Sequence, residues 1–236
     1  MALPKIGYPT FELILPSTKE TVKYRPFLVK EEKILLTSQA SGEANDIINA
    51  VKQVINNCIL TDKINVDTLT TFDLEYLFIK IRSKSVNNVI NLVYRDVEDD
   101  QKYSVEINLD EVEIKEDPTH VSKFDIGNGY GLVMKYPRAD LTNSLKFVEG
   151  EMDAFFEVLK NSIESVYDAE SVYKLSDSTP EEVDEFIQSL DTKAFKKIQD
   201  FFSTMPKLYY EVKYTNSLGN DKVIPLTSLT DFFTLG

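Results

Sequence analysis

The chain of 236 residues contains a single cysteine, Cys58, and a single histidine, His120. An intramolecular disulfide needs two cysteines, and a structural zinc site needs several cysteine or histidine ligands, so neither can hold this fold together. Folding therefore depends on the burial of apolar side chains. The composition allows it, because 42% of the residues are hydrophobic and 11% are aromatic, which excludes global disorder.

The net charge of −13 and the absence of targeting patterns exclude several classes of partner. Nucleic acid would be repelled unless basic residues were concentrated locally, and the sequence shows no such patch. The N-terminus lacks the charged start and apolar core of a signal peptide, and no apolar run approaches the roughly 20 residues that cross a bilayer. We therefore expect a soluble, intracellular chain with no nucleic-acid and no membrane partner.

The hydrophobic pattern of the first part of the chain alternates between the periods of strands and helices. A hairpin, three helices and a group of strands are predicted. The expected strands cover 11–15, 21–25, 89–94, 103–109, 124–126 and 131–136, and the expected helices begin at residue 30 or cover 47–59 and 72–82. Cys58 falls on the apolar stripe of the second helix, which favours a buried structural thiol over a nucleophile.

The second part of the chain, from residue 147 to 205, is predicted to be helical with an interruption at 176–178. Thr179, Pro180 and Glu182 have the spacing of a capping box with proline in the first turn, so a helix should begin there. Another helix should cover 192–203 and stop at Pro206. The chain then ends in a hairpin with strands at 208–214 and 223–226.

These elements together predict an α+β protein. An N-terminal hairpin and helices should surround a mostly antiparallel sheet, followed by a helical C-terminal part that ends in a β-hairpin. We expect an N-terminal α+β part over 1–145 and a C-terminal part over 146–236, two parts that could share one core.

No set of residues in the sequence forms an obvious catalytic or cofactor site. Four carboxylates in 96–101 suggest calcium, but the glycine and distal glutamate of an EF-hand loop are missing, so a solvated hairpin tip is preferred. Gly127–Gly131 lacks the spacing of a phosphate-binding loop and is interpreted as a turn. Asp110, Glu111 and Glu113 resemble a solvated strand face, and His120 lies in an expected loop. We therefore expect no catalytic residue, no metal and no cofactor.

Several stretches in the same order along the whole chain resemble one family. These stretches are Leu3–Lys5, Tyr24–Lys33, Phe72–Ser85, Phe201–Lys207 and Leu229–Phe233. They are similar to the T4-type tailed-phage baseplate hub proteins, a family that includes a hub subunit and a hub assembly catalyst. The matching stretches are structural signatures and contain no catalytic motif.

The resemblance implies a non-enzymatic phage protein required for assembly of the central hub of a contractile-tail baseplate. Its partners would be other hub proteins of the same phage, and it would act in the host cytoplasm and possibly in the virion tail. Two roles stay open: a structural hub subunit, or a chaperone-like assembly factor that is absent from the finished virion. Some relatives carry cysteine pairs at such hairpin tips, but the tips here, 96–101 and 215–221, have none, so no zinc-ribbon function is expected. A carboxylate-based hydrolase is a remote alternative.

Two groups of residues are candidates for protein contacts. Exposed aromatics near the C-terminus would suit an interface, although packing of the last hairpin onto neighbouring helices is the alternative. The acidic tip of the middle hairpin could steer basic faces of neighbouring subunits. The candidates are Pro206, Tyr209, Tyr210, Phe232 and Phe233 in the first group, and Glu98, Asp99 and Asp100 in the second.

Overall fold

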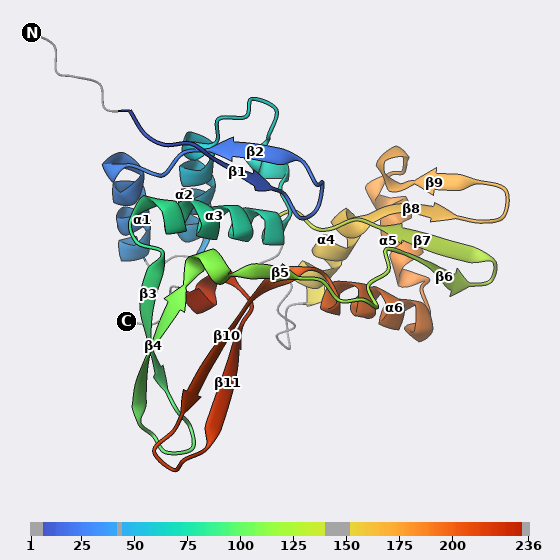
Figure 1. Cartoon of the computed structure of the whole chain (residues 1–236). Helices are drawn as coiled ribbons and strands as arrows, with labels where there is room; N and C mark the ends of the chain where they lie inside the picture. Colours follow the sequence, from blue (N-terminus) through green and yellow to red (C-terminus); the bar gives the residue numbers. More distant parts are fainter. Residues whose placement is uncertain (1–6, 42–43, 140–151, 233–236) are drawn as a thin grey trace, which may run out of the picture. The chain divides into compact units, whose positions relative to one another are not determined.

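The computed structural model describes residues 7–41, 44–139 and 152–232 (Figure 1). The helices are α1 (Val29–Ser41), α2 (Ala44–Cys58), α3 (Thr71–Ser85), α4 (Met152–Ser162), α5 (Pro180–Gln188) and α6 (Thr192–Ser203). The strands are β1 (Phe11–Ile14), β2 (Thr21–Tyr24), β3 (Val89–Arg95), β4 (Lys102–Asn108), β5 (Glu113–Lys115), β6 (Lys123–Gly127), β7 (Tyr130–Met134), β8 (Ile163–Tyr167), β9 (Val172–Lys174), β10 (Lys207–Thr215) and β11 (Asp221–Leu226). All strand pairs are antiparallel, so the predicted α+β class is confirmed.

The chain divides into two compact units. The first unit combines Met1–Lys115 with Lys207–Gly236, and the second consists of Glu116–Pro206. The expected boundary at 145 falls in the second unit, and the last hairpin belongs to the first. The reason is that β10 pairs with β5, with Leu208 opposite Ile114. The second unit is therefore an insertion between two strands of one sheet.

The N-terminal region of the first unit is held by a buried ion pair between Arg25 and Glu31. Their side chains are 6% and 0% exposed, and Arg25 Nη2 lies 3.0 Å from Glu31 Oε1. Arg25 also donates to the carbonyl of Asn57 at 2.7 Å, and Glu31 accepts the amide hydrogen of Leu28 at 2.9 Å. The pair therefore joins the end of β2 to the start of α1 and the end of α2.

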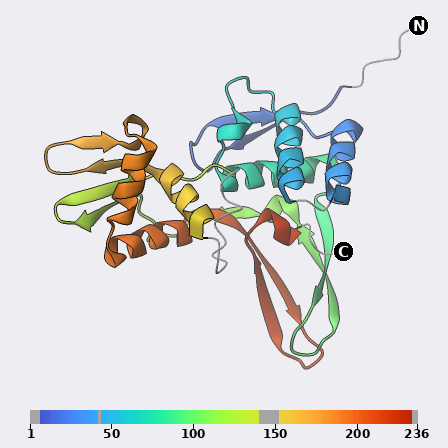
Figure 2. The ribbon, with the colours of Figure 1, turned by 180° about the vertical axis from the view of Figure 1, so that it is seen from behind.

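The rest of the first unit consists of two hairpins and the apolar core that they share. The β3–β4 hairpin and the β10–β11 hairpin lie side by side in Figures 1 and 2. Leu92, Ile107, Leu208 and Leu226 from the four strands meet Ile79 of α3 in one buried cluster. The predicted hairpins and the predicted helix at 72–82 are confirmed, with ends that differ by a few residues.

In the second unit, three helices pack with a four-stranded sheet of order β6-β7-β8-β9. The core joins Leu132 and Val166 of the sheet to Phe155, Leu159 and Phe201 of the helices. The capping box of α5 and the bounds predicted for α6 are confirmed. None of the described helices is long and apolar enough to span a membrane.

The prediction that 147–205 is helical outside the interruption at 176–178 is wrong, because β8 and β9 lie within it. Phe155, Leu159, Ile163 and Val166 have a spacing that is compatible with one apolar helical stripe. In the structure, α4 ends at Ser162, and Ile163 begins a strand whose side chains alternate between buried and exposed positions at its start. Ile163 and Val166 are β-branched and Tyr167 is aromatic, and these residue types favour an extended chain that can pair with β7 over continuation of the helix.

Removal of one partner of the Arg25–Glu31 pair should be costly. We expect Glu31→Gln to lower the free energy of unfolding by about 3 kcal/mol, because Arg25 is left as a buried, unpaired charge. Arg25→Met should lower it by less, since Lys30 Nζ still lies 3.3 Å from Glu31 Oε1. The double variant Arg25→Met/Glu31→Gln, which combines the two changes, should be more stable than the sum of the two losses predicts. Urea denaturation of the four proteins measures this coupling. Losses that add to within about 0.5 kcal/mol would show that the two charges act independently.

The paired hairpin tips as candidate functional site

The tips of the β3–β4 and β10–β11 hairpins are bound to each other within the first unit (Figure 2). The tip loops cover 96–101 and 216–220, between strands that pair in full register. Asp100 and Gly219 have φ angles of 61° and 83°, so each loop turns through the left-handed region. The carboxylates of the first loop face the amides, hydroxyls and one lysine of the second hairpin.

Glu98 binds three side chains of the second hairpin. Its carboxylate accepts hydrogen bonds from Asn216 Nδ2 at 2.7 Å and from Asn220 Nδ2 at 2.8 Å. Lys222 forms an ion pair with the same carboxylate. The charge of Lys222, followed by the two amide donors, lowers the pKa of Glu98. The negative charge of Glu98 is therefore partly neutralised within the chain.

Asp99 binds both the side chain and the backbone amide of Ser217 in the second loop. Its Oδ2 accepts hydrogen bonds from Ser217 Oγ at 2.7 Å, from the Ser217 amide at 3.0 Å and from Tyr103 Oη at 2.5 Å. Desolvation raises the pKa of Asp99, but these donors and the Gln101 amide outweigh it and lower the pKa. The ionised carboxylate thus fixes the relative position of the two loops.

A tyrosine layer lies behind the tips. Tyr214 contacts Tyr103 and Tyr94, with ring centroids 4.7 and 6.0 Å apart, and donates to Asp96 Oδ2 at 2.8 Å. Asp96 is 2% exposed and also accepts the amide hydrogen of Glu98 at 2.7 Å. The aromatic contacts and these hydrogen bonds give the tips a preorganised surface.

The predicted interface residues of the middle hairpin therefore differ in whether their carboxylates are bound between the tips or exposed. Glu98 and Asp99 are used in contacts between the tips. Asp100 is exposed and pairs with Arg95 of its own hairpin at 2.7 Å. The interpretation of 96–101 as an isolated, solvated tip is too simple, since the second hairpin binds its carboxylates. Of the described residues, no group of three or more His, Cys, Asp or Glu side chains is arranged to hold a metal ion.

The predicted aromatic interface residues also have different environments in the structure. Tyr209 and Tyr210 are partly buried on β10, and Lys115 lies 3.9 Å from the Tyr209 ring centroid. Pro206 is partly buried immediately before β10. Phe232 is 1% exposed and belongs to the core cluster of the first unit. It is therefore a packing residue and not an exposed interface aromatic. Phe233 lies outside the described residues.

The short C-terminal turn that carries Phe232 is held by two carboxylates. Glu75 of α3 accepts the amide hydrogen of Leu229 at 3.0 Å, and Asp231 accepts those of Thr227 and Ser228 at 2.8 and 2.9 Å. Burial, together with the charge of Asp231, raises the pKa of Glu75 to about 7. No sequence signal predicted this role of Glu75, since the two segments are far apart in the chain.

Cys58 and His120, the residue types that could serve as nucleophile and base, are buried and partly buried, respectively. Burial raises the pKa of the Cys58 thiol to about 11, which disfavours the reactive thiolate. His120 Nδ1 lies 2.9 Å from Thr204 Oγ1, and its ring contacts those of Tyr136 and Phe201. Burial lowers the pKa of His120. The two side chains lie in different units and serve as packing groups.

Comparison with known proteins identifies the family. The sequence model of a family described as T4 bacteriophage base plate protein matches residues 8–234. The chain belongs to this family of baseplate proteins. No curated protein and no solved structure gives a significant match. The match covers both units and both hairpin tips, so the whole described architecture is that of a T4-type baseplate protein.

Loss of Asp99 should separate the tips of the baseplate protein without unfolding it. We expect Asp99→Ala to increase amide hydrogen exchange over 216–220 at least about tenfold, because Ser217 loses its charged acceptor. Asp100→Ala is the matched control, since Asp100 lies in the same loop but pairs with Arg95 of its own hairpin. Hydrogen–deuterium exchange followed by mass spectrometry measures both variants. Equal protection of 216–220 in the two variants would contradict the role of Asp99.

The raised pKa of Glu75 should make stability depend on pH. Because the pKa is about 7 when folded and near 4.5 when unfolded, this group stabilises the fold below pH 4.5, and that contribution is lost as the pH rises to about 7. Glu75→Gln keeps an acceptor for Leu229 and should raise the free energy of unfolding at pH 7.5 by about 1–2 kcal/mol, with little change at pH 4. Urea titrations at both pH values test this, with exposed Glu106→Gln as control. A variant less stable than the parent at pH 7.5 would contradict it.

Proposed function

We propose that this baseplate protein is a subunit of the central hub of a contractile-tail baseplate and acts through protein–protein contacts. The observation that carries the proposal is the family match over 8–234. The resemblance of the sequence to hub proteins supports the narrower assignment to the hub. Its partners would be other hub proteins of the same phage, met first in the host cytoplasm and then in the virion tail.

A non-enzymatic role is supported by the way in which the reactive residue types are used. Cys58 and His120 are packing groups. Asp110, proposed as part of a solvated carboxylate face, binds Lys84 at 2.7 Å and Asn88 at 3.2 Å. Carboxylates engaged in structural bonds are poor candidates for the acid and base of a hydrolase.

The hairpin tips are proposed as one contact surface of the hub subunit. The network through Glu98, Asp99 and Tyr214 orders two loops that would otherwise lose conformational entropy on binding. Asp100 remains exposed at this surface and offers an acidic group to a basic neighbour. On the other hairpin, Leu218 is 61% exposed at the tip and offers an apolar contact.

A second candidate is a transient assembly factor with the same fold. The acidic composition favours it, because an excess of negative charge keeps an unassembled protein soluble and makes its association dependent on ionic strength. A hub subunit and an assembly factor would both bind hub proteins. They differ in whether the chain stays in the finished particle.

Quantitative mass spectrometry of purified virions separates the two roles. We expect several copies of this chain per particle, at a constant ratio to the other baseplate proteins. A catalytic or regulatory protein would not show a fixed structural stoichiometry. Absence from virions together with abundance in lysates of infected cells would contradict the hub-subunit role and establish the transient assembly factor.

A further inference from the structure

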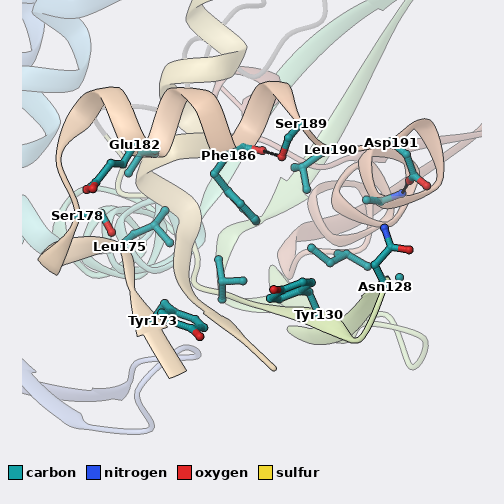
Figure 3. A pocket seen from close by; sticks show the side chains of 15 residues that line it. Asn128, Tyr130, Tyr173, Leu175, Ser178, Glu182, Phe186, Ser189, Leu190 and Asp191 are labelled. Atoms are coloured by element: carbon teal, nitrogen blue, oxygen red, sulfur yellow. Dashed lines mark hydrogen bonds between the residues drawn. The ribbon is translucent and has the colours of Figure 1, made fainter. Parts of the chain in front are cut away.

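The second unit contains an open groove of about 490 Å³ between α5 and the sheet (Figure 3). Phe186 lines it from α5, Leu190 from the connection between α5 and α6, and Tyr130 and Tyr173 from the strands. Tyr130 is 45% and Tyr173 is 50% exposed. A groove of this size and aromatic lining accepts one or two apolar side chains of a partner.

The groove is lined in large part by a strongly acidic stretch of the chain. Residues 164–191 carry nine acidic side chains and one basic side chain, so they account for −8 of the net charge of −13. Of the described residues that line the groove, Glu182 and Asp191 are charged, and both are acidic. A partner that enters this groove therefore meets negative charge at its rim.

The two carboxylates are held in place by the helices that they cap. Glu182 accepts the amide hydrogen of Thr179 at 2.8 Å, and Asp191 accepts that of Ala194 at 2.7 Å. Each ionised carboxylate has two oxygens and about four acceptor positions, so one cap bond leaves room for a cationic donor. The rim is thus preorganised for lysine or arginine.

We propose that this groove binds a basic segment of another protein. An apolar side chain of the segment enters between Phe186 and Tyr130, and flanking lysine or arginine residues pair with Glu182 and Asp191. Charge complementarity decides the occupant, since a second copy of this chain would bring like charges together at the same face. That the partner is another baseplate protein rests on the proposed function.

A peptide array tests the groove directly. The probes are overlapping 15-residue peptides that cover the other baseplate proteins of the same phage, and the full chain is the labelled ligand. We expect binding to concentrate on peptides that combine lysine or arginine with an aromatic or branched apolar residue. The affinity of the strongest peptide, measured by fluorescence anisotropy, should fall as the salt concentration rises. Failure of every basic peptide to bind would overturn the proposal.

Two conservative substitutions remove the charge of the groove and keep the caps. Glutamine at the third helical position and asparagine at the N-cap preserve both cap bonds, so Glu182→Gln/Asp191→Asn should fold normally. We expect this variant to bind the peptide about tenfold more weakly. Glu164→Gln/Glu181→Gln is the matched control, because it removes the same charge from exposed positions outside the lining. Equal loss of affinity in both variants would overturn the proposal.

The occupant in the infected cell is identified by a photocrosslinker. Replacement of Tyr173 by p-benzoylphenylalanine keeps an aromatic ring at the groove, and the crosslinked peptide is sequenced by mass spectrometry. A crosslink to a basic segment of another baseplate protein supports the proposal. A crosslink to a second copy or within the same chain overturns it, as does no crosslink. Copy number in virions is measured separately, so failure here leaves the test of the hub role unchanged.

Discussion

The antiparallel pairing of β5 with β10 is the constraint on which the first unit depends. It places Leu208, which is fully buried, opposite Ile114. The pairing joins the two chain segments that form the first unit, one before and one after the inserted residues 116–206. The cost of closing so long a segment grows only with the logarithm of its length, and an insertion that folds on its own core is tolerated more easily still. The sheet and the core cluster of this unit both require the returning strand.

The same returning strand makes the paired tips possible. Since β10 continues into a hairpin, its loop meets the loop of β3–β4, and Glu98 and Asp99 find donors that are more than 100 residues away. In this chain, which has a single cysteine, charge-assisted hydrogen bonds and the ring of Tyr214 hold the tips together.

The charge of this baseplate protein is divided unequally between its two units. Residues 116–206 carry 18 acidic and nine basic side chains, a net charge of −9, and the remaining residues carry −4. In the first unit Glu75 and Glu98 are bound within the fold while Asp100 and Glu106 are exposed, and in 164–191 most carboxylates are exposed. The inserted unit therefore carries most of the net negative charge, and the first unit carries the ordered hairpin tips.

The sequence by itself determined the elements that depend on contacts close along the chain. The hairpins, the amphipathic helix that buries Cys58, the capping box at Thr179 and the bounds of α6 follow from periodicity and from bonds that reach three or four residues. Only the tertiary structure decided that α4 gives way to β8, that Phe232 is buried and that the two tips bind each other. Those outcomes depend on contacts between residues far apart in the chain, such as the pairing of Val166 with Leu132 and the hydrogen bonds of Ser217 to Asp99. Local patterns contain no information about such pairs, because a carboxylate at a hairpin tip is equally compatible with water and with a distant donor.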